Sequence, residues 1–189
     1  PITITTLPAI AQLWLTPRLG RLRAAIGARQ VSVHALEAAP NMLRDLYDIS
    51  LFLGAPGEGE VMATDQVFPV CAPAIAAQIH TADDLAGQVL LHDASWARDW
   101  AAWAQDVGVP LPNADEGPRY SLYSLALAEA KAGAGVALGH GFLVQDALED
   151  GSLVQPLPHA MTTGQALILQ LGPACDPVDA AAISAALRA

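Results

Sequence analysis

Polar residues suited to ligand binding lie at the ends of strands predicted from this sequence. Thr5 and Thr6 close a β-branched run that begins at Ile2, and Pro8 then fits the first turn of a helix. A strand that runs directly into a helix leaves free backbone N–H groups and a partial positive charge at its carboxyl end. Open α/β sheets bind small polar ligands at that edge. The sequence therefore predicts a site for a small polar ligand there.

Further candidates follow the predicted strands in the second half of the chain. They lie in the turn after a strand at 89–92, at the start of a helix at 122–132, just past a strand at 136–139, and near the return to the first half. The predicted ligand-binding set is Thr5, Thr6, Leu7, Ala9, Asp93, Ser95, Ser121, Tyr123, Ser124, His140 and Thr163. Two alternatives stay open: Ser121 and Ser124 are also suited to capping the helix, and His140 to a surface loop.

No motif specific for catalysis is present. The chain has no Gly-x-Ser-x-Gly sequence, and its five histidines show no His-x-x-x-His or Glu-x-x-His spacing on a predicted helix. The glycines at 133 and 135 lack the third glycine of a nucleotide-binding loop and follow a helix, so they indicate a helix end. The sequence predicts no metal site, no cofactor and no enzyme activity.

Strands and helices alternate along the chain, which predicts a parallel α/β sheet. The first helix spans about 9–26 and ends at Gly27, and a second is predicted at 42–48 with Asn41 as its cap. Strands are predicted at 2–6, 30–36, 49–53, 89–92, 118–121, 136–139 and 164–172, and later helices at 81–86, 97–107, 122–132 and 178–187. Trp100 and Trp103 recur at helical spacing, which is more typical of core residues than of ligand-stacking residues.

Composition restricts the possible partners. The 189 residues are 53% hydrophobic and 15% charged, which is typical of a packed globular protein, and the net charge is −10. A chain this acidic has no electrostatic footprint for nucleic acid. Cys71 and Cys175 are expected to be buried reduced thiols, with a single bridge as the alternative. No apolar run approaches the length of a membrane span, and no signal peptide is visible.

Short motifs along nearly the whole chain carry a family resemblance through their order. They are Trp14-Leu15-Thr16-Pro17-Arg18-Leu19, Leu43-Arg44-Asp45-Leu46 with the following run 48–54, VFPVCAP at 67–73, LLHD at 90–93, DWAAW at 99–103, GPRYS at 117–121, AGAGVALG at 132–139 and Leu153-Val154-Gln155-Pro156. Together they resemble the effector-binding (substrate-binding) domain of LysR-type transcriptional regulators, most closely the branch of the glycine-cleavage and β-lactamase regulators.

The resemblance implies an α/β fold of two Rossmann-like lobes, similar to type II periplasmic binding proteins, with a ligand cleft between the lobes. Lobe I is expected at 1–70 plus 158–189 and lobe II at 71–157. The N-terminal DNA-binding winged helix is expected to lie outside this chain. A small-molecule effector would change the geometry of a homodimer or tetramer, and so act on separate DNA-binding domains in the cytoplasm. Exposed apolar residues of 9–26 are expected in the dimer contact.

The resemblance leaves two rivals and some departures. A periplasmic-type solute-binding protein of a transporter would share the fold, and a small enzyme is a third hypothesis. This chain has Leu7, Ala9 and Ala39 where relatives often place serine or threonine, and Phe52 where they often place arginine. Because those hydroxyls commonly hold a carboxylate, the departures argue against an amino-acid-like anion. They indicate a more apolar pocket, or one that has lost ligand sensing.

Overall fold

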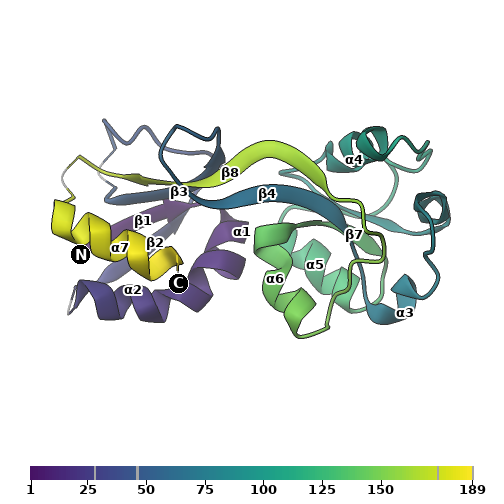
Figure 1. The fold of residues 1–189 in the computed structure, drawn as a ribbon, viewed down its shortest axis with the longest axis horizontal. Coiled ribbons are helices and arrows are strands. Elements are labelled where there is room, and N and C mark those ends of the chain that lie inside the picture. The colour runs from purple at the N-terminus through teal and green to yellow at the C-terminus, as the bar shows by residue number, and fades with distance from the viewer. Residues whose placement is uncertain (28, 46, 174, 189) are drawn as a thin grey trace. The chain divides into compact units, whose positions relative to one another are not determined.

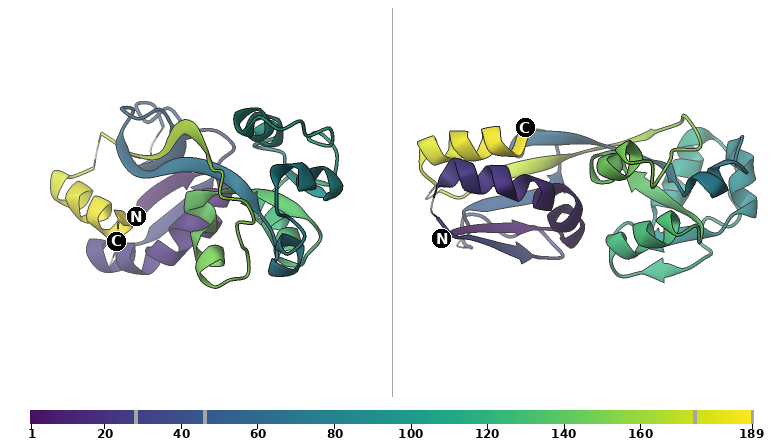
Figure 2. Two further views of the ribbon diagram at one scale, coloured as in Figure 1. Left: turned by 45° about the vertical axis from the view of Figure 1, so that its right-hand side comes forward. Right: turned by 90° about the horizontal axis from the view of Figure 1, so that it is seen from below.

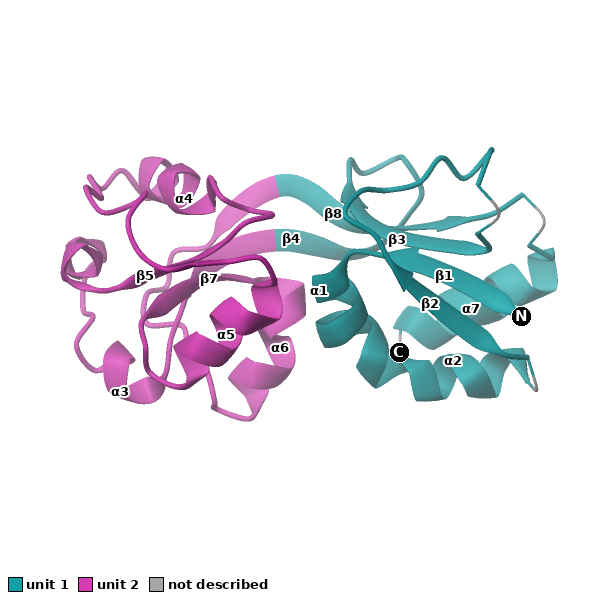
Figure 3. Cartoon of the chain, turned by 180° about the vertical axis from the view of Figure 1, so that it is seen from behind, with its two compact units in different colours: residues 1–65, 164–189 teal, residues 66–163 magenta. Residues whose placement is uncertain are grey.

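The computed structural model describes residues 1–27, 29–45, 47–173 and 175–188. It divides into two compact units, unit 1 with residues 1–65 and 164–189, and unit 2 with residues 66–163 (Figure 3). The chain leaves unit 1 inside strand β4, Glu60–Val70, and returns to it inside strand β8, Met161–Leu171. Unit 1 is therefore assembled from both ends of the sequence, whereas unit 2 is continuous.

Unit 1 contains the three strands predicted at the start of the chain. Strand β1, Ile2–Thr6, pairs in parallel with β2, Val31–Ala35, and with β3, Ile49–Gly54. Strand β8 then pairs antiparallel with β3, so the order is β2-β1-β3-β8. The β-branched run favours a strand because branched side chains fit a pleated, packed surface. The prediction of a parallel α/β arrangement for this part of the chain is confirmed.

One helical segment follows β1 and covers residues 8–26. It begins as α1, Pro8–Ile10, and continues through a wider π-turn at Ala11–Leu15. A tighter 3-10 turn at Thr16–Arg18 then leads into α2, Leu19–Ile26. Gly27 follows with φ +72°, a left-handed conformation that suits glycine. The predicted helix and its end are confirmed, with a π-turn that periodicity alone does not reveal.

The helical segment buries its large apolar residues inside unit 1. These are Ile10, Trp14, Leu15, Leu22 and Ile26, whereas Pro17, Ala24 and Ala25 stay exposed. Arg18 joins the segment to helix α7, Pro177–Arg188: its Nε donates to the carbonyl of Leu187 at 3.1 Å, and its guanidinium lies 4.4 Å from the Trp14 ring. Helices α2 and α7 lie side by side in Figures 1 and 2.

The helix predicted after Asn41 is wrong. Residues 42–44 form a turn, in which Asn41 Oδ1 accepts the Leu43 N–H at 3.0 Å and the Asn41 N–H donates to Asp45 Oδ2 at 2.9 Å. Asparagine and aspartate favour such local side-chain bonds over helix propagation. Residue 46 of the predicted helix lies outside the described residues.

Unit 2 has a mixed sheet with the order β4-β7-β5-β6. Strand β7, Val136–His140, runs antiparallel to β4 and parallel to β5, Leu90–Asp93, and β6, Arg119–Tyr120, is parallel to β5. The helical elements are α3 at Pro73–Ala76, a 3-10 helix at Ala82–Gly87, α4 at Asp99–Val107, α5 at Tyr123–Lys131 and α6 at Gly141–Glu149.

Helix α4 supplies the centre of the unit 2 core. Trp103 is 1% exposed and Trp100 2% exposed, and their rings meet edge to face at a centroid distance of 6.3 Å. The prediction that both tryptophans are core residues is confirmed. Gly133, with φ +81°, ends α5 as predicted, whereas the sequence reasoning made no prediction for α6.

Both cysteines are free in the described structure. Cys71 is buried, and this burial raises the pKa of its thiol to about 11, so it stays protonated at neutral pH. Cys175 is half-buried, so the expectation of two fully buried thiols holds only for Cys71. Among the described residues, no helix has the length and apolar character needed to span a membrane.

Candidate functional site

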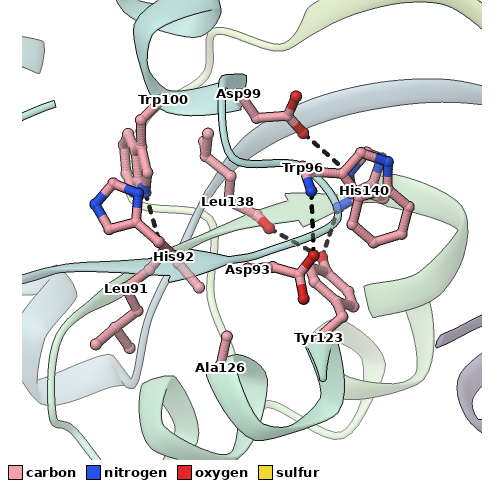
Figure 4. Close-up of a pocket in the computed structure, with 11 residues that line it drawn as sticks. Leu91, His92, Asp93, Trp96, Asp99, Trp100, Tyr123, Ala126, Leu138 and His140 are labelled. Atoms are coloured by element: carbon pink, nitrogen blue, oxygen red, sulfur yellow. Dashed lines mark hydrogen bonds and ion pairs between the residues drawn. The ribbon is translucent and has the colours of Figure 1, made fainter. Parts of the chain in front are cut away.

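A small pocket lies in unit 2 where two parallel strands end. Strand β5 ends at Asp93 and the neighbouring strand β7 at His140, so both side chains reach the same edge of the sheet. Asp99 comes from the start of α4 and Tyr123 from the start of α5. The cavity between these groups has a volume of about 20 Å³, which is room for roughly one water-sized group (Figure 4).

His140 is held on several sides. Its backbone N–H donates to the hydroxyl of Tyr123 at 2.9 Å, and that hydroxyl donates to the carbonyl of Leu138 at 2.9 Å. Its Nε2 lies 3.1 Å from Asp99 Oδ2, an ion-pair contact when the imidazole is protonated. The Trp96 ring packs on the imidazole at a centroid distance of 4.1 Å. Because the side chain of His140 is 2% exposed, the surface-loop alternative is wrong.

Asp93 has one satisfied and one unsatisfied carboxylate oxygen. Its Oδ1 accepts the backbone N–H groups of Ser95 at 2.8 Å and Trp96 at 3.2 Å, which fix the orientation of the carboxylate. Its Oδ2 is buried and accepts no hydrogen bond within the part of the chain that the structure describes. Burial raises the pKa of Asp93, and the bonds from Ser95 and Trp96 and the charge of His140 oppose that rise.

The other residues predicted for this part of the chain lie around the pocket without lining it. Ser95 is exposed, and it acts on the pocket through Asp93, to which its backbone N–H donates and with which its side chain also interacts. Ser121 is exposed and precedes α5, and Ser124 is half-buried in the first turn of that helix. The cap of α5 is Leu122, with no side-chain hydrogen bond, so the capping alternative for the two serines is wrong. Thr163 is half-buried within β8, at the end of unit 2.

The residues predicted in unit 1 gather at the end of β1. Thr5 and Thr6 are fully buried, and Thr6 Oγ1 donates to the carbonyl of Leu51 at 2.7 Å, so this hydroxyl has a structural partner. Thr5 Oγ1 is buried and has no hydrogen-bond partner among the described residues. Leu7 is the half-buried residue that precedes α1, and Ala9 is buried in it. Their part in ligand binding stays a prediction.

Phe52 and Ala39, two of the positions at which this chain departs from its relatives, lie in different environments. Phe52 is buried in β3 and pairs with Ile168 of β8, so it is a packed core residue. Ala39 is exposed in the loop after β2. A buried aromatic ring at 52 removes the possibility that this side chain holds an anion.

Asp99 and the side chain of Trp96 were missed as site residues. Asp99 is the first residue of α4, a position that favours an acid because of the helix dipole, so sequence alone assigns it a structural role. Its place in the pocket depends on how the start of α4 packs near the end of β7. Within the described residues, no group of three His, Cys, Asp or Glu side chains is arranged to hold a metal ion.

Because the pKa of Asp93 is raised in the folded protein, the stability of the protein should depend on pH through this residue. Above its ordinary value of 3.8, the unfolded chain ionises this carboxyl more readily than the folded protein does. Its contribution to stability is therefore full below pH 3.8 and is lost as the pH rises through the folded pKa. Asp93→Asn keeps an acceptor for Ser95 and Trp96 but cannot ionise. We expect the melting temperature of the variant, relative to the parent, to rise between about pH 4 and pH 7.

A matched variant separates this effect from a general charge effect. Asp83 is exposed, and Asp83→Asn makes the same change in charge outside the pocket. Thermal melts of both variants and the parent across this pH range should show the relative gain for Asp93→Asn alone. A difference between Asp93→Asn and the parent that is independent of pH would contradict the burial argument.

The sequence matches one family profile over most of its length, LysR substrate binding domain, at residues 1–171. It is 33% identical over 175 residues to the glycine cleavage system transcriptional activator of Escherichia coli K12, covering 89% of this chain and 57% of that protein. It is 31% identical over 160 residues to the transcriptional activator AmpR of Rhodobacter capsulatus, covering 82% of this chain and 54% of that protein. The chain thus spans little more than half the length of these relatives.

Solved structures share the fold. The effector domain of AmpR from Pseudomonas aeruginosa superposes with a TM-score of 0.79 at 21% identity, covering 99% of this chain and 93% of that domain. The full-length virulence activator AphB of Vibrio cholerae, a member of the LTTR protein family, gives a TM-score of 0.72 at 15% identity, covering 99% of this chain and 67% of that one. At these identities the likeness concerns the fold alone.

Proposed function

This chain belongs to the LysR substrate-binding domain family, and from that premise we propose that it is the ligand-sensing domain of a LysR-type transcriptional regulator. The observation that carries the proposal is the unit 2 pocket: Asp93 lines this small cavity, and its buried Oδ2 has no hydrogen-bond partner among the described residues. A buried polar atom left without a partner costs free energy. An effector with a matching donor would remove that cost.

The proposed mechanism is a shift between conformations. An effector that binds one conformation more tightly than another moves the equilibrium by the difference in affinity. In this proposal the change alters the geometry of a homodimer or tetramer and so the spacing of DNA-binding domains. DNA contact belongs to a separate domain, because this chain carries a net charge of −10. The regulator would act in the cytoplasm, where its DNA lies.

Two observations support details of this proposal. The relatives named above are transcriptional regulators, which favours regulation over catalysis or solute transport. Pro17, Ala24 and Ala25 are exposed apolar residues of the first helical segment and are available for self-association. These residues lie within 9–26, the range expected to supply the dimer contact, whereas the large apolar residues of the segment are buried inside unit 1. We keep the buried hydroxyl of Thr5 as a second candidate contact for the effector.

The test is a thermal melt of this domain against a panel of amino acids, amines, aromatic carboxylates, cell-wall fragments and apolar compounds. A ligand at about 100 times its dissociation constant adds about 2.7 kcal/mol of stability. For a domain of this size, that raises the melting midpoint by about 5–10 °C. We expect at least one selective shift, and sedimentation velocity with the same ligand should show a self-associated protein whose sedimentation coefficient changes on binding.

A flat panel over a sharp, cooperative melt would contradict ligand sensing by this domain. A monodisperse monomer at high micromolar concentration, with and without ligand, would contradict transmission through oligomer geometry.

A further inference from the structure

We propose that the unit 2 pocket recognises a primary ammonium group, –NH₃⁺, with Asp93 Oδ2 as its principal acceptor. The inference rests on the proposed function, because it names the chemical class of the effector group that enters the pocket. Four features of the pocket point to this group: the orientation of Asp93, the charge of the lining, the aromatic walls and the size of the cavity.

Asp93 is oriented to accept a donor from the cavity. The two backbone N–H groups of Ser95 and Trp96 are both bonded to Oδ1, and Figure 4 shows the bond from Trp96. Oδ2 is left as the second acceptor of a residue that lines the pocket. The residue is 7% exposed, and Oδ2 has no donor among the described residues. Buried carboxylate oxygens normally accept hydrogen bonds, so the geometry calls for a donor supplied by a ligand.

The charge of the lining selects a cation over an anion. Of the described residues that line the pocket, Asp93 and Asp99 are acids and none is lysine or arginine. The lining also holds two histidines, of which His92 has its Nε2 engaged by the carbonyl of Glu116 at 2.7 Å. A protonated His140 would be shared between Asp99, at 3.1 Å, and Asp93, so one positive charge would face two carboxylates. Ionised Asp93 therefore attracts a cationic group and repels a carboxylate or phosphate.

Aromatic side chains form much of the wall and favour the same kind of group. The Trp96 ring meets the Tyr123 ring edge to face at a centroid distance of 5.0 Å and lies beside His140, and Trp100 also lines the pocket. Aromatic faces attract ammonium groups, and walls with few water contacts strengthen the attraction between opposite charges. Asp99 keeps 23% of its side chain exposed, which leaves the pocket in contact with solvent.

The cavity size separates one cation from others. A volume of about 20 Å³ accepts a water-sized group, and an ammonium nitrogen with its hydrogens has that size. A planar guanidinium or a quaternary ammonium is several times larger. A hard metal ion would require more oxygen ligands than the two carboxylates provide, and the described residues contain no three-residue metal cluster.

The experiment is an NMR titration of the ¹⁵N-labelled domain with methylammonium chloride, at constant ionic strength set with sodium chloride. We expect saturable shifts at the backbone of residues 93–99 and at the Trp96 indole, with a dissociation constant on the order of 10 mM for so small a fragment. Tetramethylammonium, guanidinium and acetate at the same concentrations should leave these signals unchanged. Asp93→Asn should weaken methylammonium binding by at least about tenfold, as expected when a charged partner is lost.

Asp106→Asn is the matched control, because it removes the same charge from an exposed position on α4 outside the pocket, where the partner of Asp106 is His159. It should keep parent-like binding, and unchanged signals far from the pocket will show that both variants are folded. The inference is overturned if methylammonium produces no saturable shift, if the larger cations or acetate bind equally, or if Asp93→Asn binds as the parent does.

The two proposals fail in different ways. An effector without an amine that stabilises the parent and Asp93→Asn equally would overturn the ammonium assignment and leave ligand sensing intact. A metabolite panel without any stabilising ligand, beside a positive methylammonium titration, would support the pocket chemistry and contradict the proposed ligand-sensing function.

Discussion

Replacing Trp103 by alanine is expected to lower the free energy of unfolding by about 3–5 kcal/mol, the usual cost of removing a fully buried tryptophan. Trp103 is 1% exposed at the centre of the unit 2 core, with Leu85, Leu90 and Val136 in the same cluster. The change removes the apolar area of the ring and leaves a cavity that the surrounding strands and helices fill only in part. Urea unfolding followed by far-UV circular dichroism measures the loss.

The effect should extend to the site, because α4 carries both Trp103 and Asp99. Trp103→Phe is the control: it keeps an aromatic ring, and the indole N–H that it removes has no hydrogen-bond partner among the described residues. The phenylalanine variant should therefore lose much less stability than the alanine variant. A loss below about 1 kcal/mol for Trp103→Ala, typical of a surface position, would contradict the assigned core.

Replacing Tyr123 by phenylalanine is expected to cost about 1–3 kcal/mol, although only one oxygen atom is removed. The hydroxyl accepts the His140 N–H and donates to the Leu138 carbonyl, both at 2.9 Å, in a buried position. Its removal takes away a partner from two buried backbone groups at the end of β7. Because His140 also contacts Asp99 and Trp96, we expect weaker binding of methylammonium as well.

Tyr120→Phe provides a matched comparison. Tyr120 lies three residues earlier, half-buried on β6, and its hydroxyl bonds the exposed side chain of Glu129. Because solvent can replace that partner, loss of the hydroxyl should change stability by no more than about 0.5 kcal/mol. Urea unfolding and the NMR titration, applied to both variants, separate a specific role of the Tyr123 hydroxyl from a general effect of tyrosine. Equal stability of the two variants would show that the buried network contributes nothing.

Several elements could be predicted from local sequence, because their causes are local. A run of β-branched residues at 2–6 favours an extended backbone, Gly27 and Gly133 adopt conformations that suit glycine, and the apolar spacing on α4 places Trp100 and Trp103 in the core. The turn after Asn41 was predicted as a helix because periodicity was weighed above the local bonds of asparagine and aspartate.

The site was predicted in part. Of the predicted residues, Asp93 and His140 end adjacent parallel strands and Tyr123 begins α5, and all three line the pocket. Their part in ligand binding stays a prediction. The rule that ligands bind at carboxyl ends of strands also selected Ser121 and Ser124, which lie outside the pocket because α5 turns Tyr123 inward instead. Successive side chains on a helix point about 100° apart. The packing of the whole helix decides which of its first residues faces the cavity.

The sequence by itself determined the family, the alternation of strands and helices, and the strand ends from which polar groups emerge. Those properties follow from residue types and their order along the chain. Only the tertiary structure decided that Asp99, Trp96, Tyr123 and His140 surround Asp93, and that one carboxylate oxygen is left without a donor among the described residues. The reason is physical: burial and hydrogen-bond partners are set by contacts between elements distant in sequence, which no local pattern contains.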